Sequence, residues 1–154
     1  MKLAETTVQD DEESIHLLTS LLVRYPEVCT INYSPRGNLL KLSFIIKLQL
    51  DKKAFQLFSE ELQDCIGTYR HYEDGTKPRY FKVGYALGPG LTILEITRDT
   101  ATLTQKEIAL LIKYLHEKFN QTVVCEEMFM EEEELVEQDD IIKNMLDKFR
   151  KKKP

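Results

Sequence analysis

Two strand-like runs joined by a Gly-Pro-Gly turn constrain the fold of this chain more than any other feature. The runs cover residues 81–87 and 91–97, with Gly88-Pro89-Gly90 between them. Because glycine reaches positive φ and proline fixes its own φ, the turn predicts a β-hairpin. The odd-numbered positions from 81 to 87 are aromatic or aliphatic, whereas the even-numbered positions are small or polar. The hairpin therefore indicates a sheet that is buried on one side.

Further strands and helices are predicted on both sides of the hairpin. Residues 27–33 and 40–49 alternate between the two faces of a strand, and turn residues at 34–38 join them. A first amphipathic helix precedes Pro26, and a second follows a cap at Asp51 and ends near Gly67. A third begins at Thr104, which forms a capping box with Glu107. A short strand is expected at 122–125, after this third helix.

These elements predict an α+β fold with two layers. One antiparallel or mixed sheet of four to five strands carries helices on one face, in the order αββαββαβ with a further C-terminal helix. Residues 41–125 alone follow the β-α-β-β-α-β order of a ferredoxin-like arrangement. The strand at 27–33 competes with the one at 122–125 for the same place, so a related antiparallel sheet is the alternative. One core is expected to contain Leu42, Phe44, Phe58, Leu62, Val83, Tyr85, Ile112 and Leu115.

Length and composition fit one globular domain with distinct ends. The 154 residues are 42% hydrophobic, which is enough for a sizeable core. We expect a disordered N-terminus at 1–10 and a single domain at 11–126. Residues 127–154 are expected to form an acidic hinge and an amphipathic helix with a basic end.

The charge and the cysteines limit the classes of partner and cofactor. The net charge of −5 argues weakly against nucleic-acid binding as the default. The three cysteines lie far apart and form no CxxC pair, so neither a zinc site nor any cofactor is expected. No signal peptide is expected at the polar N-terminus, and no apolar run reaches about 20 residues. We therefore expect a cytoplasmic protein that does not enter membranes.

The segment from 69 to 82 is the first candidate binding site, and we expect it to be a loop. Its cations alternate with aromatic residues, a combination that suits the phosphates and bases of single-stranded nucleic acid. Against this, Glu73 and Asp74 dilute the positive charge, and loop aromatics often pack onto the core. The candidate binding residues are Tyr69, Arg70, Tyr72, Lys77, Arg79 and Lys82.

The C-terminal segment is the second candidate. Its apolar residues recur at helical spacing, so they can dock on the chain's own fold, exchange between protomers or engage another protein. The candidate docking residues are Ile141, Ile142, Met145, Leu146 and Phe149.

A non-enzymatic interaction or adaptor module, able to form a homodimer, is the function that the sequence favours. The chain has no G-x-S-x-G motif, no phosphate-binding loop, and no cysteine within a helical turn of a histidine. The alternative is a module that binds single-stranded nucleic acid or another anion through residues 69–82.

Overall fold

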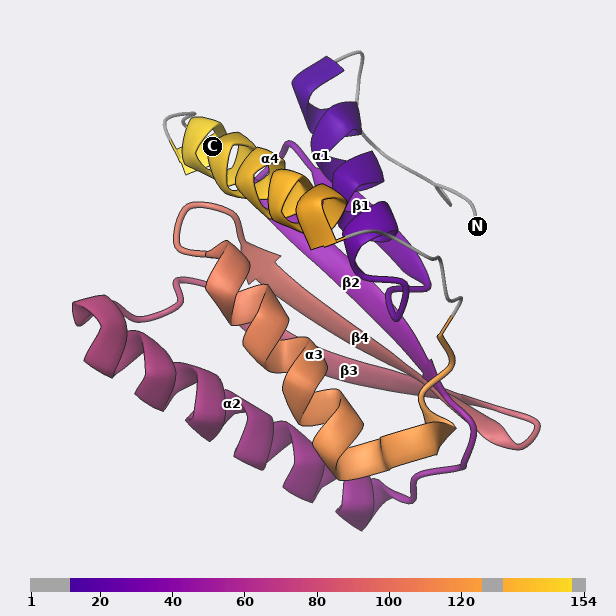
Figure 1. Cartoon of the computed structure of the whole chain (residues 1–154). Coiled ribbons are helices and arrows are strands. Elements are labelled where there is room, and N and C mark those ends of the chain that lie inside the picture. The colour runs from indigo at the N-terminus through magenta and orange to yellow at the C-terminus, as the bar shows by residue number, and fades with distance from the viewer. Residues whose placement is uncertain (1–11, 126–131, 151–154) are drawn as a thin grey trace.

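The computed structural model describes residues 12–125 and 132–150, and it confirms the α+β class (Figure 1). Four α-helices and four β-strands follow one another in this part of the chain. A short 3₁₀ turn at Asn120–Thr122 follows the third helix. The elements are α1 (Glu12–Arg24), β1 (Thr30–Ser34), β2 (Leu39–Ile46), α2 (Lys52–Asp74), β3 (Phe81–Gly88), β4 (Leu91–Asp99), α3 (Gln105–Phe119) and α4 (Glu132–Arg150).

The four strands form one sheet in the order β1-β2-β4-β3, and every neighbouring pair is antiparallel. The predicted hairpin is present as β3 and β4, with Gly88 opposite Leu91 across the turn. Gly90 has a φ of 70°, which glycine adopts without strain, so the Pro89-Gly90 pair makes the tight turn that the sequence predicts.

The sheet order does not confirm the ferredoxin-like arrangement. The residues expected to form a final strand, 122–125, contribute only one isolated antiparallel bridge, between Val123 and Ile46. β1 lies beside β2 instead and pairs with it from Leu39 to Ser43. Each position on one edge of β2 can pair with only one other strand. Because β1 occupies this edge from Leu39 to Ser43, residues 122–125 can pair only near its end, at Ile46.

Helix α2 is longer than the sequence pattern predicts. It continues past Gly67 and ends at Asp74, where Gly75 has a φ of 73° and its N–H reaches the carbonyls of Arg70 and His71. A glycine inside a helix costs only about 1 kcal/mol, so the packing of the following turn outweighs it. The prediction of a loop from 69 to 82 is therefore wrong in its bounds: the connection between α2 and β3 covers only 75–80.

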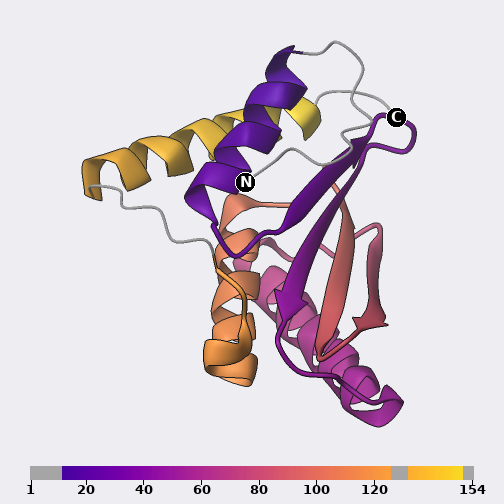
Figure 2. The same cartoon turned by 90° about the vertical axis from the view of Figure 1, so that its right-hand side faces the viewer.

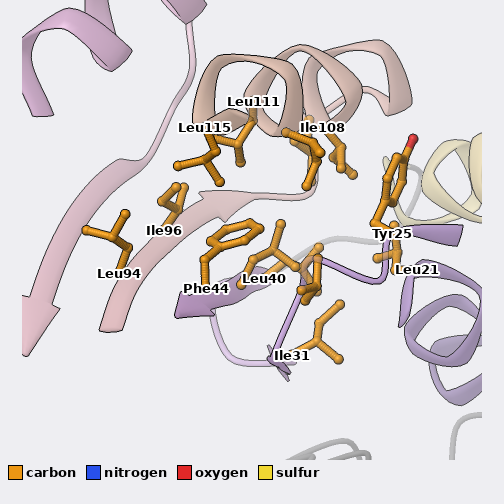
Figure 3. Packing of buried hydrophobic residues seen from close by; sticks show 14 of the residues in the cluster. Leu21, Tyr25, Ile31, Leu40, Phe44, Leu94, Ile96, Ile108, Leu111 and Leu115 are labelled. Carbon is orange, nitrogen blue, oxygen red and sulfur yellow. The ribbon is translucent and has the colours of Figure 1, made fainter. Parts of the chain in front are cut away.

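The four helices lie on the same side of the sheet, and the core fills the space between them and the strands (Figures 1 and 2). Six of the eight predicted core residues are buried, and Val83 and Tyr85 are partly buried against the same cluster. In Figure 3, Leu111 and Leu115 point from α3 toward Phe44 on β2. This contact joins the middle of the sheet to the helical layer.

We expect Phe44→Ala to lower the free energy of unfolding by about 3–5 kcal/mol, because Phe44 is fully buried and its removal leaves a cavity. Chemical denaturation measures the change. Leu57→Ala on α2 is the control, since Leu57 is 52% exposed and should change stability by less than about 1 kcal/mol. Equal effects of the two substitutions would contradict the orientation of β2.

Candidate functional site

The six residues predicted to bind nucleic acid fall on three different elements. Tyr69, Arg70 and Tyr72 belong to the last turns of α2, whereas Lys82 belongs to β3. Lys77 and Arg79 lie in the connection between these elements and are exposed. Tyr72 is 82% exposed and is therefore accessible to a ligand, but Tyr69 is partly buried.

Arg70 does not join this surface, because its side chain is buried inside the protein. Its Nη2 donates to Thr76 Oγ1 at 2.7 Å and lies 3.2 Å from Asp74 Oδ2. Its Nε is 3.8 Å from Oε1 of Glu107 on α3, and among the described residues neither Nε nor Nη1 has a hydrogen-bond partner. Arg70 thus links the end of α2 to the start of α3.

A second buried arginine, Arg98, holds the same carboxylate from the other side. Its Nε donates to Glu107 Oε2 at 2.5 Å and its Nη2 to Glu107 Oε1 at 2.6 Å, a bidentate pair. Glu107 occupies position N3 of the predicted capping box, and its N–H does bond to Thr104 Oγ1. Its carboxylate, however, binds Arg98 and not the backbone. The sequence patterns did not predict this cluster, although Arg98 and Asp99, two charged residues at the end of an apolar strand, could have indicated it.

Asp99 completes the cluster and fixes the start of β3. It accepts hydrogen bonds from the N–H groups of Arg79, Tyr80 and Thr102, at 3.1, 2.9 and 3.0 Å. Burial by itself would raise the pKa of Asp99, but the hydrogen bonds from Thr102 and Tyr80 and the charge of Arg98 together lower it below its ordinary value. Asp99 therefore stays ionised at neutral pH and holds the connection before β3.

A hollow of about 260 Å³ lies beside this cluster, between the end of α2, the start of α3, and α4. Among the described residues, three cations line it, Arg70, Lys106 and Lys143. Three carboxylates, Glu73, Asp74 and Asp147, also line it. Because the opposite charges are equal in number, the lining does not select an anion or a cation.

The outer face of the sheet is not covered by any helix in the described part of the chain (Figure 2). One row across this face is polar, with Lys41 beside Thr97 and Thr97 beside Lys82. Another row is apolar, with Ile45 beside Ile93 and Ile93 beside Ala86. The face thus combines charged, hydroxyl and aliphatic side chains.

The candidate docking residues of the tail pack mainly onto the chain itself. Ile142 and Leu146 are buried in the core, and α4 lies beside α1 (Figure 1). Ile141 and Met145 are partly buried, and the side chain of Phe149 lies outside the described residues. In this conformation the two most buried members of the stripe are not presented to a partner.

A polar contact reinforces the position of α4. Asp139 Oδ1 accepts from Arg24 Nε at 2.7 Å and from Gln105 Nε2 at 3.0 Å, so one carboxylate joins α4 to both α1 and α3. Next to this contact, burial and the charge of Asp139 raise the pKa of Tyr25 to about 12. Tyr25 therefore remains protonated at neutral pH.

Comparisons with protein-family models, curated proteins and solved structures gave no significant match. Among residues 12–125 and 132–150, no helix has both the length and the hydropathy to cross a bilayer. Within those same ranges, no three His, Cys, Asp or Glu side chains are grouped as a metal site requires.

We expect Leu146→Ala to lower the free energy of unfolding by about 2–5 kcal/mol, because the leucine is buried between α4 and the rest of the core. Val136→Ala is the matched control on the same helix, since Val136 is 56% exposed. Thermal or chemical denaturation distinguishes the two. An unchanged stability for Leu146→Ala would mean that α4 is not docked in solution.

Proposed function

We propose that this chain is a non-enzymatic protein-interaction module, and that the outer face of its sheet is the contact surface. The observation that carries the proposal is the position of the helices, which all lie on the opposite side of the sheet (Figure 2). Within residues 12–125 and 132–150, the outer face is therefore open to a partner across four strands.

The chemistry of this face supports a protein partner. An antiparallel sheet can leave a polar face to water, but here Ile45, Ile93 and Ala86 form an apolar row. Glu95 lies in the next row of the same face, and its Oε2 is 3.7 Å from Nζ of Lys41 in the row beyond. Transient protein–protein interfaces combine apolar and charged side chains in this way, since their apolar fraction is close to that of ordinary protein surface. We further propose a cytoplasmic location, which is supported by Cys29 and Cys65 not being in disulfides.

A photo-crosslinking amino acid at position 97 tests the proposal in cells that make the protein. Thr97 lies on the central strand β4, and its side chain belongs to the outer face of the sheet. We expect covalent protein adducts from Thr97, because a partner bound to the face lies within reach of the probe. The same side chain at Lys113, an exposed position on α3, is the control. Adducts from Thr97 no more abundant than those from Lys113 would rule the face out as a contact surface.

A second candidate function, binding of single-stranded nucleic acid, is favoured by the exposed residues between 72 and 82. Tyr72 offers an exposed aromatic ring for stacking. Lys77, Arg79 and Lys82 are exposed, and no ion pair joins them to another residue within the described ranges. Arg70 does not belong to this candidate site, because its charge is used inside the protein.

If this second function holds, affinity for short single strands falls steeply as salt rises, since neutralised phosphates release counterions. Lys77→Ala and Arg79→Ala should each flatten the logarithmic salt dependence by about 0.7, the slope that one neutralised phosphate of a single strand contributes. Tyr72→Ala should weaken binding with little change in that slope. Lys53→Ala, at an exposed position near the start of α2, is the control. Fluorescence anisotropy at low salt that detects no binding would eliminate this function.

A further inference from the structure

The strand β3 is one edge of the sheet, and the direction of its backbone groups can be worked out at both of its ends. Near its start, the N–H of Asp99 donates to the carbonyl of Tyr80 at 3.2 Å. At its end, Gly88 is opposite Leu91 across a two-residue turn, the position of a hydrogen-bonded pair. The carbonyl of Gly88 also accepts from Gln49 Nε2 at 2.6 Å, from the β2 side. The backbone N–H and C=O groups of residues 80 and 88 therefore both point toward β4.

Hydrogen-bonded and non-bonded pairs alternate along an antiparallel ladder. The even-numbered residues from 82 to 86 therefore also direct their N–H and C=O groups toward β4. The odd-numbered residues from 81 to 87 direct theirs away from the sheet. Within the described ranges, no strand pairs with this side of β3. The result is an unpaired edge of eight residues, whereas β1 at the opposite edge has only five.

We propose that a second copy of this chain pairs with β3, antiparallel and with Gly84 opposite the partner's Gly84. The proposal rests on the proposed function as an interaction module and names one partner for it. The eight-residue edge would otherwise offer unpaired backbone groups for uncontrolled association, which native proteins avoid. Pairing two such edges joins the two sheets into one continuous sheet of eight strands.

The sequence of β3 is complementary to itself in this register. Phe81 comes opposite the partner's Leu87, and Val83 comes opposite the partner's Tyr85, so apolar side chains meet on the helical side. Leu87 is 55% exposed in the single chain, and this contact covers it. Lys82, the one charged residue of the strand, comes opposite the partner's Ala86 and not opposite a second lysine. Shifting the register by two residues in one direction pairs only residues 81–85 of the strand. Shifting it by two in the other direction brings Phe81 opposite the partner's Pro89, which has no N–H to donate.

The flank of helix α2 that faces away from α3 is uncharged at its middle, at Ser59 and Gln63. Glu61 of α2 accepts from Tyr114 and Lys118 of α3, so that flank of α2 faces α3. Ser59 and Gln63 are each two residues from Glu61 and therefore lie on the opposite flank. Both are uncharged, and Gln63 Nε2 donates to Ser59 Oγ at 3.0 Å. Where two copies of α2 approach each other at Ser59 and Gln63, uncharged polar side chains would thus meet.

A cysteine at the two-fold axis tests the register directly. Gly84 comes opposite itself as a non-hydrogen-bonded pair, where Cα atoms are about 4.5 Å apart and a disulfide can form. A Cβ at Gly84 meets no heavy atom within 4 Å, so Gly84→Cys should fold normally. We expect this variant to form a disulfide-linked dimer under mild oxidation, on denaturing gels without reductant. Lys82→Cys, two residues away and exposed, is the control and should not link to itself.

Charge exchange provides a second measurement that needs no covalent bond. Ala86→Lys places a new cation opposite the partner's Lys82 at two symmetric positions. We expect it to weaken the dimer by roughly 2- to 30-fold in sedimentation or light scattering over a range of concentrations. Adding Lys82→Glu to the same chain converts the opposed charges to an attractive pair and should restore association. Both positions are exposed, so neither change should unfold the chain.

The outcomes distinguish this proposal from the proposed function. A chain that stays monomeric at every concentration overturns the pairing, whereas adducts from Thr97 to another protein would leave the interaction function standing. A dimer that Gly84→Cys does not link and that the charge exchange does not alter also overturns the pairing, because the contact then lies elsewhere. Disulfide linkage of Gly84→Cys alone, with loss and recovery of the dimer in the charge variants, supports it.

Discussion

The buried pair of Arg98 and Glu107 is the interaction on which the arrangement of the elements depends. It joins the end of β4 to the first turn of α3, and Arg70 brings the end of α2 to the same carboxylate. Asp99, held by Arg98 at 2.5 Å, fixes the residues that lead into β3. A buried ion pair adds little net stability, but removing one partner leaves an uncompensated charge and costs about 3–5 kcal/mol. The cluster therefore selects one relative position for two helices and two strands.

With this position fixed, the apolar surfaces are distributed unevenly between the two sides of the sheet. α1 and α4 bury their apolar stripes against each other and the core, while α2 and α3 cover the remaining inner face. The outer face and the β3 edge have no such cover among the described elements. A partner can thus bind this side without disturbing the core. That separation of a stable helical side from an open strand side is the physical basis of the proposed interaction function.

Local sequence patterns predicted the helices, strands and turns well where a few neighbouring residues determine the local structure. The Gly-Pro-Gly turn predicted the hairpin, because the φ angles of proline and glycine favour a tight reversal of the chain direction. The caps at Asp51 and Thr104 predicted where α2 and α3 begin, since each side chain accepts an N–H of the first turn. The apolar alternation in β2 predicted which of its side chains are buried. The apolar spacing of the tail predicted an amphipathic helix, but not the element on which it docks.

What the sequence by itself determined, then, is the type and inner face of most elements, because backbone dihedrals, caps and side-chain periodicity act within a few residues. Tertiary structure alone decided the sheet order, the burial of Arg70, and the docking of α4 on α1. Each of these joins residues far apart in the chain: Arg24 and Asp139 are 115 positions apart, and Arg98 reaches Glu107 only after the chain turns into α3. Competition among segments for the same edge or the same carboxylate depends on the whole fold, and no local pattern encodes its result.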